Sequence, residues 1–267
     1  MRRILFALVA SCGACALVTD LSTLSGDGGA DAADATVDAP FADSAPDAAA
    51  VDAASDAAND ACSSVAFVQA IANGEFSPQV TTVAATFPAP SVAGDYVVVG
   101  LNYEGACGAV ANVTDSLGDT YRLLGSFDSS SSALVLETWG AHVTGAGSDT
   151  MTAQLTSACD LRNIKAVELR GIDSALLPPV PSASQKGAGG APTTSIATNG
   201  PALLFAHTGD SIAAIAPGAS WTKALIDDWV TLGEYELVDE AGTYPVSFVP
   251  EAGEDWAILA VALPACQ

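Results

Sequence analysis

Residues 95–103 read DYVVVGLNY, and this stretch decides the fold class. Its valines are β-branched, a side-chain type that is enriched in strands. Apolar residues follow one another here instead of alternating with polar ones, which is typical of a central strand that lies buried in a sheet. The stretch therefore predicts a β-protein in which at least one strand runs through the core.

Similar segments lie on both sides of this strand, and Gly, Pro, Asp or Ser ends each of them. Many short strands at this spacing, with little helical periodicity, predict an all-β fold, a two-sheet antiparallel β-sandwich over residues 62–267. No internal repeat is visible, and residues 177–192, rich in Pro, Ser and Gly, predict one long loop. The other predicted strands are TTVAATF (81–87), two strands within VANVTDSLGDTYRLLG (110–125), SALVLETWGAHV (132–143), DTMTAQLT (149–156), NIKAVEL (163–169), TTSIAT (193–198), PALLFAHT (201–208), SWTKALI (220–226), VTLGEYELV (230–238), TYPVSFV (243–249) and DWAILAVAL (255–263).

The chain begins MRRILFALVASCGAC, with a basic start, an apolar run and small residues. This order is typical of a secretory signal, and the run is shorter than the ~20 apolar residues that span a bilayer. The stretch resembles a bacterial lipoprotein signal, in which a Cys after small residues is acylated. Cys15 gives the more usual leader length and Cys12 fits the local pattern better, while a plain secretion signal stays open. We expect residues 1–14 to be a lipoprotein-type signal peptide.

Residues 15–61 are an acidic Ala/Asp-rich spacer. Nine aspartates lie between residues 25 and 61 without a Lys or Arg, and the apolar content is mostly alanine. Like charges at a spacing of three to five residues oppose a helix, and methyl groups build no core, so we expect disorder. A flexible chain of the 37 residues from 25 to 61 averages ~30–35 Å from end to end. We therefore expect the spacer to act as a tether that holds a folded domain away from a membrane.

The whole chain is acidic, with 31 Asp and Glu against 8 Lys and Arg. Binding to a phosphate backbone requires Lys and Arg, so this composition excludes nucleic acid as the main partner. The expected partners are the membrane, through the lipid anchor, and a glycan or surface protein. The expected localisation is the bacterial outer membrane or cell surface, after export.

Seven segments, in this order, resemble a module of bacterial secreted and surface proteins: TVAATFPAPSVAGDYVVV, VTDSLGDTY, LETWGAHVTGAGSDTMTAQLT, AVELRGID, PALLFAHTGD, AGTYPVSF and DWAILAVALP. The resemblance covers about residue 65 to the end of the chain. It implies a jelly-roll-type sandwich of unassigned activity. The acid-rich leader also resembles myxobacterial-type lipoproteins. One departure from the module is Asp119, which stands where the turn usually has Asn.

After the leader four cysteines remain, Cys62, Cys107, Cys159 and Cys266. An even number in an exported chain predicts two disulfides, with three pairings open. The expected pairs are 62–266, because terminal strands of a sandwich are often neighbours, and 107–159, because both cysteines follow a strand. A metal site is the rival interpretation, but close Cys pairs are missing.

The sequence has no G-x-S-x-G, H-E-x-x-H or phosphate-loop motif, and no catalysis is predicted. FAHTGDS brings His207, Asp210 and Ser211 close in sequence, but a catalytic triad requires convergence in space, so turn and cap roles are expected. His142 is expected at the surface. Glu137 lies in the apolar stretch LVLETWG and either points to solvent or is a buried general acid of a glycoside-active enzyme.

Two further groups have alternative interpretations. Asp115 and Asp119 flank a turn with Gly118 and either hold a Ca²⁺ ion or cap the turn, with Asp115 bonding to the backbone. No other cofactor is expected. Trp221, Trp229 and Tyr235 fall in one hairpin region and either pack in the core or form an exposed platform for sugars.

An acidic run is expected to be a solvated face, and it consists of Asp227, Asp228, Glu234, Glu236, Asp239 and Glu240. The expected function is that of a cell-envelope-anchored binding or structural module without catalysis. A carbohydrate-binding module that uses the exposed aromatic residues is the first alternative, and a glycoside-active enzyme is the second.

Overall fold

The computed structural model describes residues 64–75, 80–129, 134–159, 162–173, 175–176, 178–209, 214–226, 232–250 and 255–266. The predicted signal peptide, the spacer, both candidate acylation cysteines and Cys62 lie outside these residues. Within them no helix has the length and apolar character that crossing a membrane requires.

Sixteen strands make up most of the described chain, and they confirm the predicted all-β antiparallel sandwich architecture. The strands of the first half are β1 (Ala66–Glu75), β2 (Val80–Thr86), β3 (Tyr96–Glu104), β4 (Val110–Thr114), β5 (Arg122–Ser129), β6 (Leu134–His142), β7 (Thr150–Cys159) and β8 (Arg162–Arg170), with a 3₁₀ turn, η2 (Gly105–Cys107), after β3. The strands of the second half are β9 (Ser182–Ala188), β10 (Thr193–Thr198), β11 (Ala202–Gly209), β12 (Ala214–Pro217), β13 (Thr222–Ile226), β14 (Leu232–Val238), β15 (Gly242–Pro250) and β16 (Asp255–Pro264).

The two halves repeat one topology. In the first half β1-β8-β3-β6-β5 form a five-stranded sheet and β2-β7-β4 a three-stranded sheet. In the second half the sheets are β9-β16-β11-β14-β13 and β10-β15-β12, so that adding eight to each strand number of the first half gives the second. Each half is thus a two-sheet jelly-roll-like sandwich. We call them the first and second sandwich, with five-stranded inner sheets and three-stranded outer sheets.

Strand pairing shows which residues of the two sandwiches are equivalent. Tyr96 on β3 and Leu203 on β11 each pair with the penultimate residue of the neighbouring strand, which is β8 or β16. Gly100 and His207, four residues further along, therefore occupy the same position in the two halves. They also lie against each other, since a Cβ on Gly100 would be 3.2 Å from the His207 ring.

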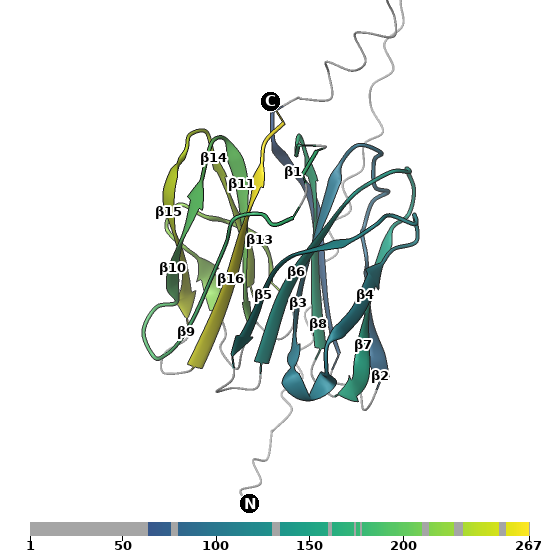
Figure 1. Ribbon diagram of the computed structural model, residues 1–267, viewed down its shortest axis with the longest axis horizontal. Helices are drawn as coiled ribbons and strands as arrows, with labels where there is room; N and C mark the ends of the chain where they lie inside the picture. The colour runs from purple at the N-terminus through teal and green to yellow at the C-terminus, as the bar shows by residue number, and fades with distance from the viewer. Residues whose placement is uncertain are drawn as a thin grey trace, which may run out of the picture. The chain divides into compact units, whose positions relative to one another are not determined.

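The two inner sheets pack face to face, which places the sandwiches side by side in four layers (Figure 1). One buried cluster joins Tyr96 and Val98 of β3 to Leu203 and Phe205 of β11. Separate clusters fill the space between the inner and the outer sheet of each sandwich. The molecule therefore has three apolar layers, of which the middle one joins the two halves.

This layering explains the continuous apolar runs in the sequence. In β3 the odd-numbered residues from Val97 face the first outer sheet and the even-numbered ones from Tyr96 face the second sandwich. Every side chain of β11 is buried for the same reason. A strand with one solvated face alternates apolar and polar residues, whereas a strand covered on both faces does not. The predicted strand at residues 95–103 is confirmed, and its second apolar face belongs to the joint between sandwiches.

The predicted long loop at residues 177–192 is wrong, because β9 lies within it. β9 pairs with β16 at the edge of the second inner sheet, from Ser182 opposite Val261 to Ala188 opposite Asp255. Most of its side chains are exposed, so main-chain hydrogen bonds hold it in place. Apolar periodicity, on which the prediction depended, is weak in such an edge strand.

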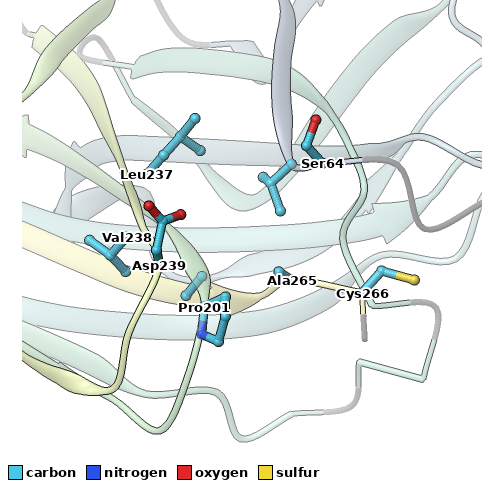
Figure 2. Close-up of a pocket in the computed structure, with 9 residues that line it drawn as sticks. Ser64, Pro201, Leu237, Val238, Asp239, Ala265 and Cys266 are labelled. Carbon is cyan, nitrogen blue, oxygen red and sulfur yellow. The ribbon is translucent and has the colours of Figure 1, made fainter.

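Both ends of the described chain lie close together. Ile172, which follows the first sandwich, forms a β-bridge with Ala265, and the Cys266 backbone N–H donates to Gly171 O at 2.9 Å. Ser64 and Cys266 line one pocket (Figure 2). The chain therefore enters and leaves the folded part at the same end of the molecule.

Candidate functional site

Glu137, one of the candidates from the sequence, has both carboxyl oxygens hydrogen-bonded to aromatic side chains. It lies on β6, opposite Leu101 of β3 and Ser126 of β5. The Tyr103 hydroxyl donates to its Oε1 at 2.8 Å, and the Trp139 indole N–H donates to its Oε2 at 2.8 Å. Both oxygens are thereby held, and the half-buried carboxylate is fixed between a phenol and an indole.

Register and strand count together explain this arrangement. Glu137 and Trp139 are two residues apart on β6 and so share one face of the sheet. The first outer sheet has three strands against five in the inner sheet, and the side chains of β5 on this face remain exposed. We call this surface the β5–β6 face, and it comprises Leu123, Ser126, Asp128, Val135, Glu137 and Trp139.

The electrostatics of the site keep its donors and acceptors in fixed roles. Burial, together with the charge of Glu137 and the hydrogen bond to it, raises the pKa of Tyr103 well above its ordinary value of 10.0. Tyr103 therefore remains a neutral donor over the physiological range. A carboxylate that accepts from two fixed donors keeps free lone pairs. It lies at the edge of the Trp139 indole, on the same face of the sheet as the 39 % exposed Leu123. This combination suits hydroxyl groups attached to an apolar ring.

The two hydrogen bonds bear on the general-acid alternative for Glu137. Both carboxyl oxygens of Glu137 already accept hydrogen bonds, one from Tyr103 and one from Trp139. A glycoside-active site needs one protonated and one ionised carboxyl group. Asp128 of β5 is exposed on the same face and is the neighbouring carboxylate. The geometry thus suits Glu137 as an acceptor of hydrogen bonds from a ligand.

The three aromatic candidates do not form one exposed platform in the described residues. Trp221 is buried in the core of the second sandwich, and its indole N–H donates to Pro245 O at 2.9 Å. Tyr235 points to the opposite side and stacks on Phe67 of the first sandwich, with ring centroids 5.0 Å apart. Trp229 lies outside the described residues. Core packing is therefore the correct interpretation for Trp221, and Tyr235 belongs to the joint between the sandwiches.

Asp115 caps the turn that follows β4. Its Oδ1 accepts the backbone N–H groups of Leu117, Gly118 and Asp119 at 3.0, 2.7 and 3.0 Å. Gly118 has φ +83°, in the left-handed region that favours glycine. Asp119 Oδ1 accepts the backbone N–H and the hydroxyl of Thr144, which fixes the turn to the loop before β7. These contacts bear out the capping interpretation of the two aspartates.

A third carboxylate, Asp149, lies near the same turn. Burial, with the charges of Asp115 and Asp119, raises its pKa to about 6. Each of the three carboxyl groups has one buried oxygen without a hydrogen-bond partner. Nevertheless, no three His, Cys, Asp or Glu side chains of the described chain come together as ligands for an ion. Among the described residues, Asp115 and Asp119 therefore have no third side chain placed to bind a Ca²⁺ ion together with them.

The histidines have structural positions. His207 is fully buried between the sandwiches, where its Nε2 lies 3.1 Å from the Thr138 hydroxyl. Burial, with the charge of Lys165, lowers the pKa of His207 well below its usual value. His142 is half-buried and its Nε2–H donates to Asp173 O at 3.1 Å. Asp210 and Ser211 lie outside the described residues. Of the three catalytic candidates in FAHTGDS only His207 is described, and solvent does not reach it.

The sequence pattern does not reveal that several charged side chains are buried. Glu234 was assigned to a solvated face, but it is fully buried and accepts the Gly218 backbone N–H at 3.0 Å. Lys165 is fully buried and donates to Asn102 and Asn163. A charged residue that alternates with apolar ones usually marks a solvated face. These residues instead face a second layer, which the local pattern does not reveal.

The predicted cysteine pairs stay predictions, because the side chain of one member of each pair is not described. Cys107 and Cys266 are disulfide-bonded, while Cys62 and the Cys159 side chain lie outside the described part of the structure. Ser64, two residues after Cys62, lines the same pocket as Cys266. Beside Cys107, the Ala109 backbone N–H donates to the Thr156 hydroxyl, and Thr156 is three residues before Cys159.

Comparison of the chain with protein-family models, with curated proteins and with solved structures finds no match.

Proposed function

We propose that this chain is an exported, lipid-anchored cell-surface protein whose double sandwich is a ligand-binding module without catalysis. The leader pattern and the acidic spacer support export and tethering. The acyl chain would hold the protein at the bacterial outer membrane, and the spacer would give the folded part a reach of ~30–35 Å. The disulfide-bonded cysteines fit an oxidising compartment outside the cytosol.

The observation that carries the binding role is the fixed Tyr103–Glu137–Trp139 arrangement on the β5–β6 face. Holding an indole and a carboxylate in place before binding reduces the entropy that binding costs. An aromatic face beside hydrogen-bond acceptors is the chemistry that recognises a sugar ring, which combines apolar C–H faces with hydroxyl groups. A glycan of the cell surface is therefore the proposed ligand class.

The test is a glycan and peptidoglycan-fragment array probed with the mature chain. Glu137→Gln keeps the shape of the side chain but removes the charge, and Trp139→Phe removes the indole donor. Each variant should weaken binding by about tenfold or more, the effect of losing one charged hydrogen bond. Trp221→Phe, which changes a buried indole of the other sandwich, is the matched control and should leave affinity unchanged.

Two results would count against this proposal. Equal loss with Trp221→Phe would mean that the variants act through stability and not at the β5–β6 face. Release of new reducing ends from a bound glycan, abolished by Glu137→Gln, would favour the glycoside-active enzyme instead.

A further inference from the structure

A pocket of about 450 Å³ lies where the two ends of the folded chain meet (Figure 2). Ser64 and Cys266 lie at one side of it, and Leu237, Val238 and Asp239 lie at the other. Leu237 is 48 % exposed there, the largest exposed fraction among the large apolar side chains described. The pocket is thus a partly apolar hollow beside the first described residue.

The repeated topology identifies the equivalent place in the first sandwich. Tyr96 pairs with His142 in the first inner sheet, and Leu203 pairs with Leu237 in the second. Because Tyr96 and Leu203 are equivalent, His142 is the counterpart of Leu237. If the two sandwiches are built alike, the segment that covers His142 has a counterpart that covers Leu237. The surroundings of His142 therefore indicate what the pocket at Leu237 would bind.

The position next to His142 that corresponds to the pocket is occupied by the linker between the sandwiches, the segment between β8 and β9. His142 donates to Asp173 O at 3.1 Å, and the Leu176 backbone N–H donates to Asp173 O at 3.0 Å. Leu176 and Val180 of this linker pack into the cluster between the inner sheets. The segment that leads into β9 thus covers the end of β6.

Strand pairing also identifies the counterpart of this linker. Ala262 donates to Pro181 O, while the residue equivalent to Ala262, Glu168, pairs with Gln69 of β1. Pro181 therefore corresponds to Gln69. The segment that leads into β1 is accordingly the counterpart of the linker that leads into β9.

β1 carries one extra residue, because its pairing with β8 passes from Phe67 directly to Gln69. Allowing for this bulge, counting back from Gln69 matches residues 60–63 to residues 173–176. Residues 60–63 read DACS and lie immediately before Ser64, which lines the pocket.

We propose that residues 60–63 dock into the pocket at Leu237, as residues 173–176 cover His142. Two further observations favour this occupant. The chain outside the described residues ends at the pocket itself, and Cys266 in the pocket wall is disulfide-bonded, with Cys62 of the docked segment as its predicted partner. The side chains of residues 60–63 are small, which suits a hollow of this volume. The tether is then free only before residue 60.

Hydrogen–deuterium exchange of the full mature chain, followed by mass spectrometry, tests the docking. Amides of residues 60–63 should exchange at least about tenfold more slowly than an unstructured chain. Leu237→Asp places a charge in the pocket opposite Asp60 and should return them to the unstructured rate. Leu123→Asp changes a similarly exposed leucine of β5 and is the matched control, which should keep the protection. Amides of β11 report whether each variant remains folded.

A Cys266→Ser variant separates docking from a covalent link. Protection that persists in it, although weaker, supports the pocket as the binding site of the segment. Protection that Cys266→Ser abolishes and Leu237→Asp leaves intact would overturn the proposal in favour of a disulfide alone. Unstructured exchange rates at residues 60–63 in the unmodified protein would also overturn it.

Discussion

Glu234 makes the stability of the second sandwich depend on pH in a predictable way. It is fully buried on β14, and its Oε2 accepts the Gly218 N–H, while Oε1 has no partner. Burial raises the pKa of Glu234 from 4.5 to about 8, with the Gly218 hydrogen bond opposing and the charge of Glu236 adding to the effect. At neutral pH the folded protein therefore holds a proton that the unfolded chain releases.

The sign and the size follow from this difference. A folded-state pKa above the unfolded value means that stability is highest below pH 4.5 and falls as the pH rises to about 8. Each unit of pKa corresponds to about 1.4 kcal/mol. The free energy of unfolding should therefore lose about 3 kcal/mol from this group by pH 7 and about 5 kcal/mol by pH 8.5.

Replacing Glu234 with Gln removes the titration and keeps an oxygen that can accept the Gly218 N–H. The variant should match the unmodified protein near pH 4.5 and exceed its stability increasingly towards pH 8.5. Urea unfolding of both proteins from pH 4.5 to 8.5 measures the difference, in which all other titrating groups cancel. Glu240→Gln changes an exposed glutamate and is the control. Parallel pH profiles for Glu234→Gln and the unmodified protein would refute the reasoning.

The remaining predictions concern the joint and the tether. Phe205→Ala empties a fully buried site between the inner sheets and should lower the free energy of unfolding by about 3–5 kcal/mol in urea titrations. Peptide mapping of the non-reduced protein should find Cys62 linked to Cys266; a link from either to another cysteine would contradict the clamp. The mature protein should partition into detergent and carry acyl mass on its first cysteine, and a soluble, unacylated main species would argue against an anchor. Residues 25–56 should be cut by proteases well before the sandwiches.

Part of the fold was predictable from short stretches of sequence, because a run of apolar residues indicates a strand that is buried on both faces. β3, β11 and β16 are continuous apolar runs, and all three were predicted as strands. β9 was not, because an exposed edge strand is held by main-chain hydrogen bonds that leave no apolar period. The repeated topology of the two sandwiches was also not visible in the sequence. Equivalent positions such as Gly100 and His207 occupy the same position in the two sheets but are different residue types.

The candidate site was predictable only at Glu137. Its partners Tyr103 and Trp139 depend on the register of β3 against β6, which no short stretch of sequence determines. The burial of Glu234 was missed for a similar reason. Its hydrogen-bond donor, Gly218, is 16 residues away, on the turn that approaches the strand from another layer.

The contact between Gly100 and His207 has a consequence for how such a joint can be built. Gly100 and His207 are equivalent positions, and they lie against each other across the joint between the sandwiches. In a dimer of identical chains, a residue on the twofold axis meets its own copy. Two glycines there would leave a hole, and two histidines would collide. A single chain that carries both halves can place a small residue against a large one, a fit that an interface between identical subunits cannot attain.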